Sequence, residues 1–245
     1  MIDGNPISNV GRFEYKYRLD LPTYARVAGA LRPMTQHDRY SLAGQNRRYF
    51  VRSLYLDTFD YEAYADKVAG VCERAKYRIR TYSPRQIDDG FAKFEIKAKH
   101  GNVTFKHDQP VSLDECSHFL ATRQWRRNPA GPVAVDFQRH VLLRNLTPKA
   151  LVDYEREALV PLDGGTTRIT FDHSVRFAAA TELFPSRTFF VNARPQFVVM
   201  EIKIKDVSPR WLDDVVRRFE LKSLPHSKYQ WAVEYTQPAV FDRLR

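Results

Sequence analysis

The segment from Arg74 to Arg80 places a cation at every second position, in the order Arg-Ala-Lys-Tyr-Arg-Ile-Arg. Because successive side chains of a β-strand point to opposite faces, all four cations project from the same face. Neighbours on that face lie about 7 Å apart, and at an effective dielectric constant of about 20 each pair repels by about 2.4 kcal/mol. Three such pairs approach the stability of a whole domain. The face must therefore be solvated or must meet negative charge.

Alternation with a period of two recurs elsewhere in the chain, often with a glutamate two residues before a lysine. It occurs in residues 12–18 (beginning with Arg12), 93–99, 152–156, 168–172 and 200–205. In an ordinary antiparallel sheet the apolar face covers the core and the charged face meets water. For any one of these strands a solvated outer face remains an alternative to a lined interior.

Four segments are expected to form amphipathic helices that need an apolar surface to cover. The first runs from residue 22 to 31, and a capping box from Ser112 to Glu115 opens the second. The third covers about residues 133–143, and the fourth has Ser208 as N-cap and Pro209 at its first position. The helices can cover the apolar faces of the strands if the charged faces point inward. This arrangement favours an α+β fold: a closed antiparallel barrel of about eight strands, flanked by helices, with a polar, basic lumen.

The chain has 39 Lys and Arg against 29 Asp and Glu in 245 residues, a formal net charge of +10 that indicates an anionic partner. No glycine-rich phosphate loop is present, so phosphate binding would rely on side chains. No Gly-, Ser- or Pro-rich linker interrupts the chain, which favours a single domain over residues 1–245.

No transmembrane segment is expected, since no stretch approaches about 18 uninterrupted apolar residues. The opening residues show no basic and apolar leader, so we expect a cytoplasmic protein whose membrane association, if any, would be peripheral or through a partner.

Carboxylates on the basic strands are the candidate metal ligands, because Mg²⁺ and Mn²⁺ take one or two carboxylates together with phosphate oxygens. The candidates are Glu14, Glu95 and Glu201. The alternative for each is that it only pairs with the lysine two residues further along. The lumen as a whole suits a polyanion and a divalent cation.

The order of the charged motifs resembles the VTC domain, the catalytic domain type of polyphosphate polymerases in the triphosphate tunnel metalloenzyme superfamily. The resemblance runs over about residues 11–236. It rests on R-x-E-x-K-Y at 12–17, S-L-Y-L-D-T at 53–58, K-Y-R-I-R-T-Y at 76–82, E-I-K at 95–97, Y-E-R at 154–156, R-I-T at 168–170, E-I-K at 201–203 and S-K-Y at 227–229.

The resemblance implies a tunnel that binds ATP with Mn²⁺ or Mg²⁺, transfers the γ-phosphate to a growing polyphosphate chain and releases ADP. By motif position, Glu201 would hold the metal. The implied phosphate ligands are Lys16, Arg78, Arg80, Lys97, Lys106, Arg156, Arg168, Ser227 and Lys228, and Lys203 is expected to add a further point charge. Of these, the residues expected to act directly in catalysis are Arg78, Arg80, Lys97, Arg156, Arg168 and Lys228.

Three alternatives to the polymerase stay open. A triphosphatase of the same fold would hydrolyse inorganic triphosphate or a nucleotide, and a non-catalytic domain would only bind polyphosphate or nucleotides. Nucleic-acid binding is the default for a basic chain, but it predicts an exposed cationic patch with aromatic residues free to stack. Strict alternation of cations with apolar groups disfavours it, so we expect no nucleic-acid partner.

Overall fold

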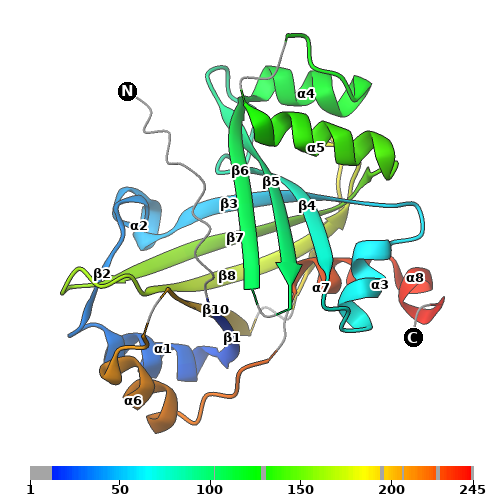
Figure 1. The fold of residues 1–245 in the computed structure, drawn as a ribbon. Helices are drawn as coiled ribbons and strands as arrows, with labels where there is room; N and C mark the ends of the chain where they lie inside the picture. Colours follow the sequence, from blue (N-terminus) through cyan, green and yellow to red (C-terminus); the bar gives the residue numbers. More distant parts are fainter. Residues whose placement is uncertain are drawn as a thin grey trace.

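The computed structural model describes residues 13–101, 103–127, 131–193, 196–205, 207–224 and 227–243. Arg12, expected at the start of the first alternating strand, lies outside these ranges. A curled antiparallel sheet runs through the chain, with helices on its outside and at one end (Figure 1). Its main strands are β1 (Phe13–Asp20), β3 (Tyr49–Asp57), β4 (Arg74–Thr81), β5 (Phe91–His100), β6 (Val103–Ser112), β7 (Thr147–Pro161), β8 (Arg168–Ala179) and β10 (Phe197–Ile204).

The sheet is open, which corrects the closed barrel expected from the sequence. Its strand order is β1-β10-β8-β7-β3-β4-β5-β6, while the short strands β2 (Thr35–His37) and β9 (Val191–Asn192) pair with β7 and β8. Over the described residues, the end strands β1 and β6 do not pair with each other. Alternation decides which face of a strand points inward, but closure also needs a matching stagger of all strands. Here the ion pair between Glu14 of β1 and Lys97 of β5, at 2.7 Å, connects the two sides of the seam.

The four helices that the sequence predicts cover the outer, apolar face of the sheet. The chain contains α1 (Leu21–Leu31), α2 (Arg39–Ala43), the 3₁₀ turn η1 (Gln45–Arg47), α3 (Glu62–Val68), α4 (Leu113–Thr122), α5 (Pro132–Leu143), α6 (Arg210–Arg218), α7 (Lys228–Thr236) and α8 (Pro238–Arg243). Helices α1 and α6 pack on β1, β8 and β10, and α4 and α5 pack on β5 and β6. Among the described residues, no helix is long and apolar enough to cross a membrane.

The four expected helices are present as α1, α4, α5 and α6, with one boundary corrected. Ser112 caps α4, since its side chain accepts a hydrogen bond from the Glu115 backbone N–H at 3.2 Å. Helix α6, however, begins at Arg210 with Pro209 as N-cap. The Ser208 hydroxyl donates instead to the Asp213 carboxylate at 2.6 Å, so it caps no backbone N–H.

Helix α7 lies against the concave face of the sheet. Its buried residues Tyr229, Ala232 and Val233 pack with Val152 of β7 and Phe177 of β8 in one apolar cluster. These two strands present apolar side chains inward at this end and charged ones further along. Helix α7 thus covers the apolar part of the concave face and begins, at Lys228, where the charged part starts.

Candidate functional site

A cavity of about 790 Å³ occupies the charged part of the concave face. Of the 23 lining residues that belong to the described part of the chain, thirteen are Lys or Arg and two are Glu, an excess of eleven positive charges. This excess is as large as the net charge of +10 of the whole chain. The strict alternation of the strands turns their cations inward, so the charge that the sequence distributes over seven strands gathers in one space.

The ten expected phosphate ligands all line this cavity. They come from β1, β4, β5, β6, β7, β8, β10 and the start of α7, and are Lys16, Arg78, Arg80, Lys97, Lys106, Arg156, Arg168, Lys203, Ser227 and Lys228. Two of the three expected metal ligands, Glu14 and Glu201, line it as well. Glu95 does not: its side chain is fully buried and contacts Arg78 and Arg80, which do line the cavity.

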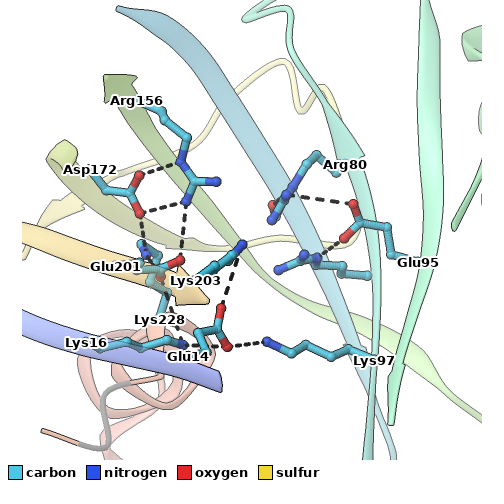
Figure 2. A network of polar contacts seen from close by, with 12 residues as sticks. Glu14, Lys16, Arg80, Glu95, Lys97, Arg156, Asp172, Glu201, Lys203 and Lys228 are labelled. Atoms are coloured by element: carbon cyan, nitrogen blue, oxygen red, sulfur yellow. Dashed lines mark hydrogen bonds and ion pairs between the residues drawn. The ribbon is translucent and has the colours of Figure 1, made fainter. Parts of the chain in front are cut away.

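One side of the cavity is built on paired carboxylates (Figure 2). Asp172 accepts two hydrogen bonds from the Arg156 guanidinium, at 2.6 and 2.9 Å, and holds that planar group in a fixed orientation. The Lys228 ammonium lies 2.5 Å from Asp172 and 2.7 Å from Glu201. Arg156 also lies 3.7 Å from Glu201. Two cations and two carboxylates therefore form one buried network.

Glu14 and Glu201 lie next to each other because β1 and β10 pair in register. Lys16 is opposite Glu201 and Glu14 is opposite Lys203. The Lys16 ammonium is 3.8 Å from Glu14 and 3.9 Å from Glu201, so the two carboxylates share one cation. Glu14 also accepts a hydrogen bond from Lys97 at 2.7 Å.

The opposite side of the cavity is organised by Glu95, which is fully buried. Its carboxylate accepts a hydrogen bond from the Arg78 guanidinium and lies 3.7 Å from Arg80 and 3.2 Å from Lys106. Glu95 is directly opposite Arg78 in the β4–β5 pairing. It neutralises part of the charge of three cations and fixes the direction in which two guanidinium groups point.

Burial and opposite charge set the protonation states. Burial alone would raise the pKa values of Asp172 and Glu201, but Lys228 and Arg156 outweigh it and hold both below their usual range. Burial lowers the pKa of Lys203 to about 7, against the effect of Glu201 and Glu14. Burial, reinforced by neighbouring lysines, also keeps the pKa of Lys76 well below 10.5. The cavity therefore contains amines whose charge a bound anion would stabilise.

Glu14 and Glu201 fit a divalent cation as a pair of hard oxygen ligands. No group of three or more His, Cys, Asp or Glu side chains among the described residues is placed to hold a metal by itself. Mg²⁺ typically takes one or two carboxylates and completes its shell with water and phosphate oxygens. These two side chains, which share Lys16, match such a donor set. Glu95 shares no ion-pair partner with them over the described ranges and is better explained as the partner of Arg78.

Sequence reasoning assigned no role to Asp172 or Lys76. The available signal was the period of two, because Asp172 stands four residues after Arg168 and Lys76 two residues before Arg78. Asp172 orients Arg156 and Lys228. Lys76 donates to the Ser227 hydroxyl at 2.8 Å, beside the start of α7. Arg168, an expected ligand, pairs at 2.5 Å with Asp38, which caps α2.

The chain belongs to the VTC domain family, whose sequence model matches residues 11–237, and so to the triphosphate tunnel metalloenzyme fold. A solved structure from Bacillus halodurans, provisionally described as an adenylate cyclase, has 15% identity and a TM-score of 0.54, and the alignment covers 89% of this chain and 95% of that one. Its similarity supports the fold.

The PH1819 protein from Pyrococcus horikoshii OT3 has 11% identity and a TM-score of 0.47, over 91% of this chain and 99% of that one. No curated protein sequence matches the chain significantly.

Proposed function

We propose that this protein is an ATP-dependent polyphosphate polymerase that transfers the γ-phosphoryl group of ATP to the end of a polyphosphate chain and releases ADP. One observation carries the proposal: thirteen cations line a concave cavity with two glutamates that could hold a divalent ion. Cations enclosed in a cavity favour a slender polyanion over a nucleic-acid duplex, which needs an exposed basic surface. We treat the chain as one domain, since a single sheet links its strands from Phe13 to Ile204.

Phosphoryl transfer asks the protein mainly for position and charge. The arginines at the cavity can each present a planar fork to non-bridging oxygens, whereas the lysines act as point charges. Asp172 and Glu95 hold Arg156 and Arg78 in place before substrate arrives, which limits the reorganisation needed on binding.

In the reaction, the bond between the γ-phosphorus and the oxygen bridging to ADP breaks. A new bond forms between that phosphorus and a terminal oxygen of the polyphosphate. That acceptor oxygen is already anionic, so no strong general base is required. Bound Mg²⁺ or Mn²⁺, held by Glu201 and Glu14, would neutralise charge on the transferred group.

Cations beyond the central group support a polymer as the acceptor. The cavity lining continues along β4 and β5 to Lys76, Arg74 and Lys99, and to Lys67 on α3. These four residues lie past the arginines at Arg78 and Arg80, towards one end of the cavity. Hydrolysis of a triphosphate would not need this extension. An anionic chain longer than a triphosphate would use it.

The alternative with the same site is a triphosphatase, in which water attacks in place of the polyphosphate oxygen. A non-catalytic binder of polyphosphate or nucleotides is the other alternative. The protein should be incubated with ATP and Mn²⁺, and polymer, ADP and free phosphate measured separately. Long polymer with equivalent ADP supports the polymerase. Free phosphate without polymer would identify a triphosphatase, and binding without turnover would identify a binding domain.

A further inference from the structure

Four aromatic side chains form a row at the end of the concave face away from α7. They are Tyr40 of α2, Tyr49 at the start of β3, Tyr82 just after β4 and Phe91 at the start of β5. Successive ring centroids lie 6.0, 6.1 and 6.4 Å apart, and the rings are tilted by 56–58° to one another. No pair in the row is stacked face to face, so no ring covers the face of its neighbour in the row. One face of Tyr40 is covered by the Arg39 guanidinium, 4.8 Å from the ring centroid.

Two members of the row lie beside arginines that line the phosphate cavity, although the rings themselves are not part of its lining. Tyr49 is opposite Arg156 in the β3–β7 pairing, and directly opposed side chains lie about 5 Å apart at their Cβ atoms. Tyr82 follows Arg80 by two residues and so continues the same face of the chain. Burial raises the pKa of Tyr49, while Arg156 and Arg168 beside it act in the opposite direction. The aromatic row thus begins where the arginines end.

Three of the four rings are exposed to an extent that core packing does not explain, whereas Tyr49 is partly buried against an apolar cluster. Tyr40, Tyr82 and Phe91 expose 54%, 39% and 47% of their surfaces. At the other end of the same concave face, by contrast, Tyr55 and Phe177 of the sheet are buried together with Tyr229 of α7. One end of the face is therefore filled by the protein's own helix, and the other presents aromatic surface next to cations.

We propose that the row binds the base of a nucleoside triphosphate whose phosphates occupy the adjoining cavity. The inference rests on the proposed function and adds a site for the base, which the cations of the cavity do not contact. A base stacks on an aromatic ring whatever its hydrogen-bonding edge, since every base has a π-face. No charged or amide group is needed for this contact. The row therefore selects a nucleotide over inorganic triphosphate but discriminates weakly among bases.

The test compares two ligands, ATP and inorganic triphosphate, each titrated by calorimetry with Mg²⁺ present. In Tyr82→Ala and Tyr40→Ala, ATP affinity should fall about five- to hundredfold, the range for the loss of a base–aromatic stack. Inorganic triphosphate affinity should change less than about twofold. Tyr82→Phe, which keeps the ring, should bind ATP as the wild type does. GTP should bind the wild type within a few-fold of ATP.

A matched control is Tyr235→Ala on α7, since Tyr235 is 37% exposed and its ring neighbours Phe177, at 5.7 Å, and not the aromatic row. It should leave both affinities unchanged. Unchanged ATP affinity in both alanine variants, or an equal loss for both ligands, would overturn the base site while leaving the phosphate cavity intact. Failure of the wild type to bind inorganic triphosphate would instead overturn the proposed function, and the base site with it. Thermal unfolding of each variant distinguishes loss of fold from loss of stacking.

Discussion

Glu14 on β1 pairs at 2.7 Å with Lys97 on β5, and this contact joins one edge strand of the curled sheet to the strand beside the other edge. The same carboxylate lies 3.8 Å from Lys16 and 3.7 Å from Lys203. One glutamate thus offsets the repulsion among three amines. The seam of the sheet and the charge balance of the cavity depend on the same side chain.

Replacing Glu14 should destabilise the free protein and matter less once phosphate is bound. Glu14→Gln leaves three partly solvated lysines facing one another, and we expect a loss of about 1–2 kcal/mol. This would lower Tm by about 2–8 °C. Inorganic triphosphate supplies the missing negative charge, so the difference from wild type should shrink when it is added. Thermal unfolding with and without triphosphate measures this.

Glu155→Gln is the matched control. The Glu155 side chain is 54% exposed, and its ion pair with Arg48 has the longer separation of 3.8 Å. Such a surface pair contributes at most about 1 kcal/mol. A Glu14→Gln variant as stable as Glu155→Gln would show that the pair with Lys97 does not hold the seam.

Arg78 should be required for triphosphate binding. Its guanidinium contacts Glu95 and donates to the Tyr55 hydroxyl at 3.3 Å, which orients it towards the cavity. Charge-assisted hydrogen bonds contribute about 1.5–3 kcal/mol each, so Arg78→Ala should weaken binding by about ten- to hundredfold. Arg78→Lys should have an intermediate affinity for triphosphate, because lysine keeps the positive charge but lacks the planar guanidinium that can donate two parallel hydrogen bonds. Calorimetry should show no change for Arg217→Ala on α6, and normal affinity in Arg78→Ala would contradict the lumen site.

Much of the cavity could be predicted from the sequence because alternation fixes the face of every strand. Arg78 and Arg80 must point to one side of β4 whichever strands are its neighbours. Glu95 shows the limit of this reasoning. Its alternation places it correctly on the concave face, but its depth depends on the register that sets Arg78 opposite it. The alternation within one strand does not determine its register with a strand far away in the sequence.

Asp172 and α7 were missed for related reasons. Asp172 acquires its role only when β7 and β8 pair so that it faces Arg156. Helix α7 spans only nine residues, and its buried side chains pack on the sheet, on α3 and on α8. A short helix with contacts on several sides has no clear amphipathic stripe to reveal it. Closure of the barrel was overestimated because it depends on all strands at once.

Glu201 should be needed for metal-dependent turnover and not for the fold. In Glu201→Gln the buried Lys228 ammonium keeps Asp172 at 2.5 Å, so it remains neutralised. We expect ADP release from ATP and Mn²⁺ to fall at least about hundredfold, since a metal ligand is lost. Asp172→Asn is the contrasting variant. It removes the bidentate partner of Arg156 and should cost about 3–5 kcal/mol of stability. Full activity in Glu201→Gln would refute the metal assignment.

The charged amine of Lys76 should favour triphosphate binding but destabilise the free folded protein. Burial first, and then the charges of Lys16 and Lys67, keep the pKa of its amine well below 10.5. Between its folded value and 10.5, the unfolded chain binds this proton and the folded chain does not. Stability from this group therefore rises with pH over that interval, and at lower pH the folded protein carries an unfavourable charge.

Lys76→Met should accordingly stabilise the free protein and weaken triphosphate binding. Removing a desolvated amine from a cationic cluster should add about 1 kcal/mol near pH 7, or about 2–4 °C in Tm. In the wild type a bound triphosphate favours the charged amine, so binding should take up protons. Calorimetry in two buffers of different ionisation heat measures that uptake, which should be smaller in Lys76→Met. A variant that is less stable than wild type and shows the same proton uptake would show that Lys76 does not titrate with the ligand.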